Sequence, residues 1–289
     1  METYDFKKTS REIRKNTLKC IASLGKGHVG GCMSVVELLS VLYDKHLHYD
    51  PKNPKMEGRD RLIMSKGHAG PALYSILSMK GFFDEAELLT LNQPHTHLPS
   101  HCDMHLTKGI DMTTGSLGQG FSCAVGVALA SRLAGDGATI YTVIGDGEAQ
   151  EGQIWEAAMF AGNQHLNHLI GFIDYNKCQV DGTVEDIADL SPLDKKWEAF
   201  KWNVIVVKDG HDEDEIDRAI TQAKQCPDKP TMIILNTTKG KGIHFVENLG
   251  PDCHHINFDQ DDLCHAVAEI DNLAEVPEEA VAGKQFDNI

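Results

Sequence analysis

Five short apolar runs recur along this chain, and stretches with helical character separate them. The runs are RLIMS at 61–65, TIYTVI at 139–144, LIGFIDY at 169–175, NVIVVKD at 203–209 and TMIILNT at 231–237. Apolar residues at helical spacing predict helices over 34–46, 70–80, 118–134, 152–165 and 212–225. Continuous apolar strands that alternate with helices favour an α/β fold, with a parallel sheet covered by helices on both faces. Ligands of such folds bind beyond the carboxyl ends of the strands, so we expect the functional site there.

No internal repeat and no linker interrupts this alternation. The chain of 289 residues is therefore predicted to form one compact domain over residues 1–270. From Asp271 onward the sequence DNLAEVPEEAVAGKQFDNI becomes acidic and rich in small residues. A short helix followed by a loose, acidic C-terminal tail is expected over 271–289.

The charge balance limits the partners. Lys and Arg total 27 against 43 Asp and Glu, which gives a formal net charge of −16. Such a chain repels nucleic acid and anionic membranes, and neither is expected as a partner. An anionic ligand would need local help from a metal ion, a helix N-terminus or histidines. The amino terminus lacks a signal-peptide core, no long apolar run follows and the eight cysteines form no CxxC pair, so a cytoplasmic protein with reduced thiols is expected.

The stretch VIGDGEAQEGQIWEAAMFAG at 143–162 joins a predicted strand to a predicted helix through Gly-Asp-Gly. The glycines let the backbone approach a ligand, while the Asp146 carboxylate projects beyond the sheet and the helix directs its N-terminus at the same space. Asn176 follows the next predicted strand, 30 positions later, so the two side chains should share one edge. Mg²⁺ with a diphosphate fits both features. For Gly-Asp-Gly alone, a tight turn with Asn176 as a cap is the competing interpretation.

Gly-Asp-Gly followed at this distance by Asn resembles the thiamine diphosphate signature of the transketolase family. Four further stretches agree in sequence, order and interval: GKGHVGG at 25–31, SKGHAGPALYSIL at 65–77, LPSHCD at 98–103 and TTGSLGQGFSCAVGVALA at 113–130. The resemblance extends over about residues 10–255 and corresponds only to the N-terminal, diphosphate-binding third to half of a full transketolase. It implies thiamine diphosphate and Mg²⁺ as cofactors, and the part that binds the pyrimidine is missing.

The resemblance also implies roles for individual residues. It makes Asp146, Asn176 and the backbone carbonyl of Cys178 the Mg²⁺ ligands. The other cofactor-binding residues that it implies are His68 and Lys239 at the diphosphate, Gly115, Ser116 and Leu117 beside the aminopyrimidine, Gly145 and Gly147 for clearance, Val180 as an apolar contact, and His254. Glu151 matches a buried glutamate that couples paired active sites through a proton network.

Three histidines match positions that handle the substrate, namely His28 in KGHVG, His101 in LPSHCD and His254. An imidazole exchanges protons near neutral pH, which suits the hydroxyl groups of a sugar. Two departures from the family pattern stand out. Ser and Cys flank His101 where the family commonly has Gly and Pro, and no Trp precedes the last histidine, where one residue is inserted. The choice between His254 and His255 therefore stays open, with His254 favoured.

The resemblance predicts the N-terminal subunit of a split, thiamine diphosphate-dependent transketolase, which transfers a two-carbon ketol unit from a ketose to an aldose. A sugar phosphate is the default substrate, and a sulfonated or otherwise modified sugar stays open. A C-terminal subunit would supply the pyrimidine-binding and C-terminal domains, including the glutamate that activates the cofactor. An α₂β₂ assembly is expected, because closed two-fold symmetry is the commonest solution.

Three alternatives compete with this interpretation. The alpha subunit of a 2-oxo acid dehydrogenase has the same cofactor half, but His28, His101 and TTGSLGQG favour the handling of a ketose. A non-catalytic cofactor-binding subunit would not need to keep Asp146, Asn176 and the histidines. A zinc site in HTHLPSHCDMH would use His95, His97, His101, Cys102 or His105, but their spacing is loose and no second ligand cluster accompanies them.

Overall fold

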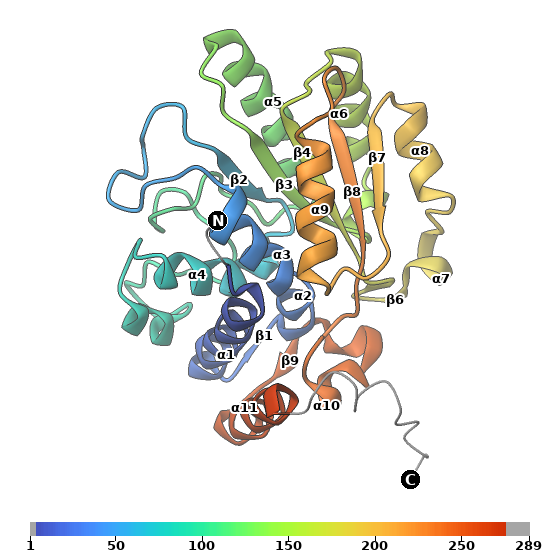
Figure 1. The fold of residues 1–289 in the computed structure, drawn as a ribbon. Coiled ribbons are helices and arrows are strands. Elements are labelled where there is room, and N and C mark those ends of the chain that lie inside the picture. Colours follow the sequence, from blue (N-terminus) through green and yellow to red (C-terminus); the bar gives the residue numbers. More distant parts are fainter. Residues whose placement is uncertain (1–3, 276–289) are drawn as a thin grey trace.

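The computed structural model describes residues 4–275 and is built around a five-stranded sheet (Figure 1). The strands lie in the order β2-β3-β4-β8-β7, and each neighbouring pair is parallel. They are β2 (Arg61–Met64), β3 (Ile140–Gly145), β4 (Leu169–Tyr175), β7 (Asn203–Val207) and β8 (Thr231–Asn236). These strands coincide with the five apolar runs, so the predicted parallel sheet is confirmed.

Helices cover both faces of the sheet, because successive side chains of a strand point to opposite sides. Tyr141 and Val143 of β3 join one hydrophobic core, and Ile140 and Ile144 join a second. The first core contains residues of α1 (Phe6–Leu24), α2 (Val29–Met33), α3 (Val36–Val41), α4 (Gly70–Met79), α9 (Glu213–Ala223) and α11 (Gln260–Glu275). The second contains residues of α5 (Gln119–Ala134), α6 (Gly152–Asn163) and α8 (Leu193–Ala199). The predicted α/β architecture is therefore confirmed.

The N-terminal helices α1 and α2 were not expected from the sequence. Polar residues outnumber apolar ones in α1, but Ile13, Leu18 and Ile21 lie on one side of it and are fully buried. Arg14 of the same helix is also buried, where it forms an ion pair with Glu37. The buried face of α1 thus combines apolar residues with paired polar groups.

Two predicted boundaries differ from the structure. The helix expected over 34–46 is α3 followed by a π-helical turn, Leu42–His46. Helix α11 continues through Glu275 and so crosses the expected boundary at 271. The rest of the expected tail, 276–289, lies outside the described residues. Within residues 4–275, no helix combines the length and apolar composition needed to cross a bilayer.

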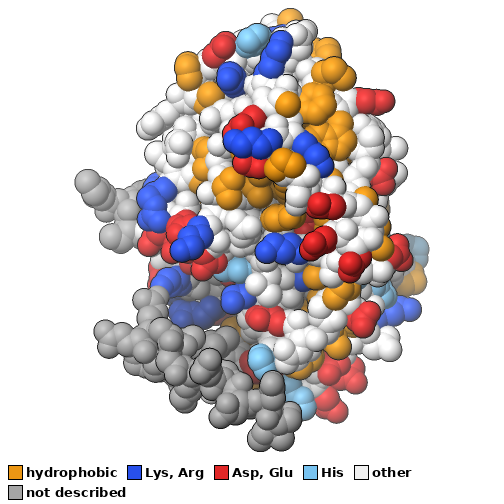
Figure 2. Space-filling model, turned by 90° about the vertical axis from the view of Figure 1, so that its right-hand side faces the viewer, with side chains coloured by type: hydrophobic (Ala, Val, Ile, Leu, Met, Phe, Trp, Pro, Cys, Tyr) orange, Lys and Arg blue, Asp and Glu red, His pale blue; other side chains and the backbone are white. Residues whose placement is uncertain are grey.

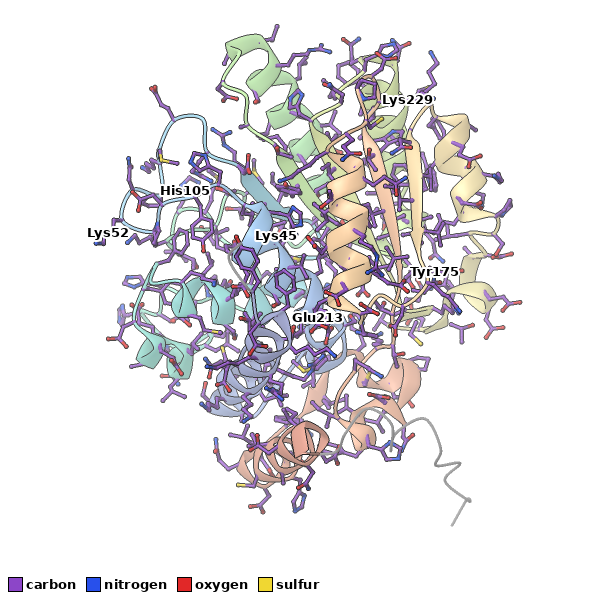
Figure 3. All side chains as sticks on the ribbon, viewed as in Figure 1. Lys45, Lys52, His105, Tyr175, Glu213 and Lys229 are labelled. Carbon is purple, nitrogen blue, oxygen red and sulfur yellow. The ribbon has the colours of Figure 1, made fainter. Side chains whose placement is uncertain are left out.

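Small elements gather beyond the carboxyl ends of the strands, at the lower edge of the sheet in Figure 1. Figure 3 marks this edge with Tyr175, the last residue of β4, and with Glu213, the first residue of α9. The small elements are β1 (Lys26–Gly27), which pairs with β9 (Ile256–Asn257), the hairpin β5 (Cys178–Gln179) and β6 (Gly182–Thr183), and the helices α7 (Val184–Ala188) and α10 (His244–Glu247). Pairing of β1 with β9 brings segments near both ends of the chain to one place.

Candidate active site

A cavity of about 500 Å³ opens at the carboxyl edge of the sheet. It is lined by most of the predicted site residues: His28, His68, His101, Gly115, Leu117, Gly145, Asp146, Gly147, Glu151, Asn176, Cys178, Val180, Lys239 and His254. Ser116 lies in the same turn as Gly115 but does not line the cavity, and neither does His255. Residues that line it without having been predicted include Lys66, Glu148, Gln179, Asp181 and Ile187. The structure thus brings together residues that are far apart in the sequence.

Asp146 and Asn176 both line the cavity, and we call the part around them the metal end because of the ligand roles predicted for them. Asp146 is 2% exposed, and its carboxylate accepts the backbone N–H groups of Gly147 (2.8 Å) and Lys177 (2.5 Å). The side-chain oxygen of Asn176 accepts the backbone N–H of Cys178 at 3.1 Å. Burial and the nearby Asp174 raise the pKa of Asp146 to about 7. A cation at this end would stabilise the charged carboxylate.

The chemistry of these donors fits Mg²⁺ better than zinc. One carboxylate, one amide oxygen and the backbone carbonyl of Cys178 form the oxygen-only set that Mg²⁺ prefers. In the part of the chain that the structure describes, no three His, Cys, Asp or Glu side chains gather as metal ligands. In the histidine-rich stretch 95–105, His101 lines the cavity while Cys102 is buried and His105 is exposed.

Positive charge and open backbone next to the metal end suit a diphosphate. Lys66 and Lys239 line the cavity and are 1% and 4% exposed. The Nζ atom of Lys239 donates to the carbonyl of Cys178 at 3.3 Å, and burial lowers the pKa of Lys239. A Cβ atom at Gly145 would have no neighbour closer than 3.9 Å, so the backbone there is open to a ligand. At Gly147, a Cβ atom would lie 2.8 Å from the side chain of Gln179, which favours glycine.

The histidines form a cluster around His28, at what we call the histidine end. The ring centroid of His28 lies 5.3 Å from that of His68, 5.5 Å from that of His101 and 5.4 Å from that of His254. Burial and the neighbouring His254 lower the pKa of His28 to about 3. Burial and Lys239 lower the pKa of His254 to about 4, and burial lowers the pKa values of His68 and His101. Neutral imidazoles each offer one donor and one acceptor, which suits contacts with hydroxyl groups.

The two candidate C-terminal histidines occupy different places. His254 lines the cavity, and its Nδ1 atom forms a hydrogen bond of 3.2 Å with Nζ of Lys239. His255 is exposed, and its ring centroid lies 4.8 Å from that of His28. The geometry therefore favours His254 as the residue within the cavity, and its role in the reaction stays a prediction.

Glu151 does not match the expectation of a buried glutamate. Its side chain is exposed where the chain enters α6. The buried carboxylate nearby is Glu148, which accepts hydrogen bonds from Ser65 Oγ and from the backbone N–H groups of Gly118 and Gly145. Burial raises the pKa of Glu148. Its position directly after Gly-Asp-Gly was the available sequence signal, and the resemblance did not assign it a role.

The apolar residues at the rim of the cavity are exposed. Leu117, Val180 and Ile187 all line the cavity and are 36%, 61% and 48% exposed. Gly115, with a φ of 150°, holds the turn before Leu117 against the ring of His101, which would lie 3.3 Å from a Cβ atom at this position. These three apolar side chains are therefore accessible to solvent at the rim of the cavity.

Fold and cavity together define an α/β domain that binds an anionic ligand at the carboxyl ends of its strands. The family model described as transketolase, thiamine diphosphate binding domain, matches residues 6–271. The chain belongs to the transketolase family, of which it forms the thiamine diphosphate-binding domain.

Relatives of similar length are single subunits. The 6-deoxy-6-sulfo-D-fructose transketolase subunit SqwG of Clostridium sp. (strain MSTE9) is 54% identical, over 92% of this chain and 96% of its own length. An apulose-4-phosphate transketolase subunit of Actinobacillus succinogenes is 39% identical, over 88% of this chain and 91% of its own length. A solved transketolase from Leishmania mexicana has a TM-score of 0.88 at 28% identity, over 93% of this chain but only 42% of its own. The chain therefore spans less than half of that solved transketolase.

Proposed function

We propose that this chain is the N-terminal subunit of a split transketolase, which transfers a two-carbon ketol unit from a ketose to an aldose. The observation that carries the proposal is the cavity, which is lined together by an oxygen donor set, two lysines and a cluster of neutral histidines. The two subunit-sized relatives are named as transketolase subunits, which supports the same conclusion. When bound, thiamine diphosphate would supply the electron sink for breaking the carbon–carbon bond.

The metal end would hold the cofactor. Asp146, Asn176 and the carbonyl of Cys178 would bind Mg²⁺, because together they offer the oxygen donors that this ion prefers. His68 and Lys239 would contact the diphosphate, together with free N–H groups at the start of α6. Gly115, Leu117 and Val180 would line the space for the rings of the cofactor, because they surround the remaining part of the cavity.

The histidine end would handle the sugar. His28, His101 and His254 face one cavity, and their low pKa values keep the imidazoles neutral at physiological pH. A neutral imidazole can accept a proton from one hydroxyl and donate a proton to another. We assign these three residues to proton transfer and hydrogen bonding at the hydroxyls of the donor and acceptor sugars.

A second subunit would complete the site. Leu117, Val180, Ile187 and Glu151 stand exposed at the rim, and burial of the apolar ones would stabilise an assembly. Further hydrophobic side chains are exposed outside the cavity: Figure 2 shows such side chains grouped on the upper part of one face, and exposed ones include Met159 (55%) and Phe160 (45%). We propose an α₂β₂ assembly with a C-terminal transketolase subunit. Such an assembly needs one contact between the two kinds of subunit and another between its two halves.

The substrates are proposed to be acidic sugars. The relatives are named for a sulfonated fructose and for a sugar phosphate, and both of these sugars carry an anionic group. Because the relative named for the sulfonated sugar is 54% identical, a sulfonated ketose is the first donor to test. The cytoplasmic location expected from the sequence stays a prediction.

A donor screen tests the proposal. The chain is combined with its C-terminal partner, thiamine diphosphate and Mg²⁺, and transfer to an aldose is followed for a sulfonated ketose, a ketose phosphate and a neutral ketose. Turnover with one or both acidic ketoses, and much less with the neutral one, is expected. Decarboxylation of a 2-oxo acid without ketol transfer would support the dehydrogenase alternative, and absence of turnover despite cofactor binding would support a non-catalytic role.

A further inference from the structure

A buried carboxylate, Asp174, lies beneath the metal end and has no role in the steps described above. It is 0% exposed and lies in β4, two residues before Asn176. Its Oδ2 atom accepts hydrogen bonds from Ser34 Oγ (2.6 Å), Lys66 Nζ (2.5 Å) and Asn176 Nδ2 (2.9 Å), and its Oδ1 atom accepts one from Thr237 Oγ1 (2.5 Å). These donors come from four separate segments of the chain, so Asp174 connects these segments through hydrogen bonds beneath the cavity.

Lys66 is the charge partner of Asp174. The two side chains are 2% and 0% exposed in their ion pair, and Nζ of Lys66 also donates to the carbonyl of Gly31 at 2.9 Å. Burial opposes the ionisation of Asp174, but Lys66 and the surrounding donors hold its pKa below the ordinary value. A buried carboxylate without this partner would add a second negative charge beside Asp146.

The contact with Asp174 decides which way the amide of Asn176 points. An amide has one accepting oxygen and one donating nitrogen. Because the nitrogen of Asn176 donates to Asp174, its oxygen faces the backbone N–H of Cys178 and the metal end. A rotated amide would place its oxygen against the carboxylate, so two acceptors would meet without a hydrogen. Asp174 therefore selects the orientation in which Asn176 presents oxygen.

We propose that Asp174 and Lys66 form a positioning pair for the metal site: Asp174 fixes the oxygen of Asn176 toward the metal, and Lys66 balances the charge of Asp174. This inference rests on the proposed Mg²⁺ site. It predicts that loss of Asp174 weakens metal binding, while the histidines that handle the sugar keep their places. Outer partners of metal ligands affect metal affinity by about 10- to 100-fold.

The test is the Mg²⁺ dependence of thiamine diphosphate binding in Asp174→Asn. Asparagine has the same shape, but it has no charge to pair with Lys66 and has one accepting oxygen where Asp174 has two, so the donors at Oδ2 and the donor at Oδ1 cannot all be accepted. Titration calorimetry on the assembled enzyme should show that the Mg²⁺ concentration for half-maximal cofactor binding rises by about 10- to 100-fold. At saturating Mg²⁺, kcat should return to within a few-fold of the original value. A change in kcat with an unchanged Mg²⁺ requirement would overturn the proposal.

Glu37→Gln is the matched control. Glu37 is also buried (4% exposed), forms an ion pair with Arg14 and contacts His211 at 3.0 Å, but it does not line the cavity. This variant should lower the melting temperature, as loss of a buried ion pair does, and leave the Mg²⁺ requirement unchanged. If both variants lower the melting temperature and neither changes the Mg²⁺ requirement, Asp174 is only structural.

Two further variants keep the test decisive. If Asp174→Asn does not fold, Thr237→Val is tested in its place, because it removes one hydrogen bond to Asp174. The Mg²⁺ concentration for half-maximal cofactor binding should then rise by a few-fold. An unchanged Mg²⁺ requirement would contradict the proposal. The loss of metal-binding free energy in the double variant Lys66→Met, Asp174→Asn should be smaller than the sum of the losses in the two single variants, because the residues act as a pair. Absence of Mg²⁺-dependent cofactor binding in the unmodified enzyme would instead refute the proposed function itself.

Discussion

The metal end and the histidine end of the cavity are built in opposite ways. At the metal end, Asp146 and Asn176 are buried, and their side chains are held by hydrogen bonds from the same chain. At the histidine end, the rings of His101 and His254 contact the ring of His28, and all three are only partly buried. We therefore expect that this chain supplies all three proposed Mg²⁺ ligands itself and that a partner subunit covers the exposed rim of the cavity.

The largest effect should follow from breaking the metal end. Asp146→Ala removes the only carboxylate among the three proposed Mg²⁺ ligands, so Mg²⁺-dependent binding of thiamine diphosphate should weaken by more than about 100-fold. Titration calorimetry of the assembled enzyme measures this. Asp181→Ala is the control, because Asp181 also lines the cavity but is exposed. Equal effects of the two variants would contradict the metal assignment.

A smaller effect, confined to turnover, should follow from changing the histidine end. His101→Ala should lower kcat/KM by about one to three orders of magnitude, which is the contribution of one positioned acid or base. Cofactor affinity should stay nearly unchanged, since His101 is not among the residues proposed to contact the cofactor or the metal. Loss of cofactor binding in this variant would show that the two ends are not separate.

The adjacent residues His254 and His255 should differ in their effect on kcat/KM. His254→Ala should lower kcat/KM by about 10-fold or more, because His254 lines the cavity and is bonded to Lys239. His255→Ala should change kcat/KM by less than about 3-fold, since its side chain is exposed. Steady-state kinetics of both variants decides the assignment, and a larger effect at His255 would reverse it.

The smallest effect concerns acid stability. His28 has a pKa of about 3 in the folded chain, well below its ordinary value near 6.5, so the unfolded chain binds more protons between these values. Its contribution to stability is present above pH 6.5 and is lost as the pH falls toward 3. The melting temperature should therefore fall on acidification, and the fall should be shallower in His28→Asn. An identical pH dependence in both proteins would show that His28 is not held neutral.

The sheet was predictable because buried parallel strands read as continuous apolar runs, and all five were found. That Asp146 and Asn176 line one cavity was also predictable, because each follows a strand and adjacent parallel strands end at one edge; their role as metal ligands stays a prediction. Asp174 and Glu148 were missed, since a buried carboxylate in a strand or turn looks like an ordinary surface residue until its partners are known. Those partners, such as Lys66 and Ser65, lie about 80 to 110 positions away in the sequence, beyond the reach of local patterns.

The central claim is that this chain contains half of a transketolase active site. The most direct test measures ketol transfer from an acidic ketose to an aldose by the purified chain alone, with thiamine diphosphate and Mg²⁺, and then after addition of the C-terminal subunit. We expect negligible transfer by the chain alone and robust transfer by the mixture. Robust transfer by the 289-residue chain without a partner would contradict the claim.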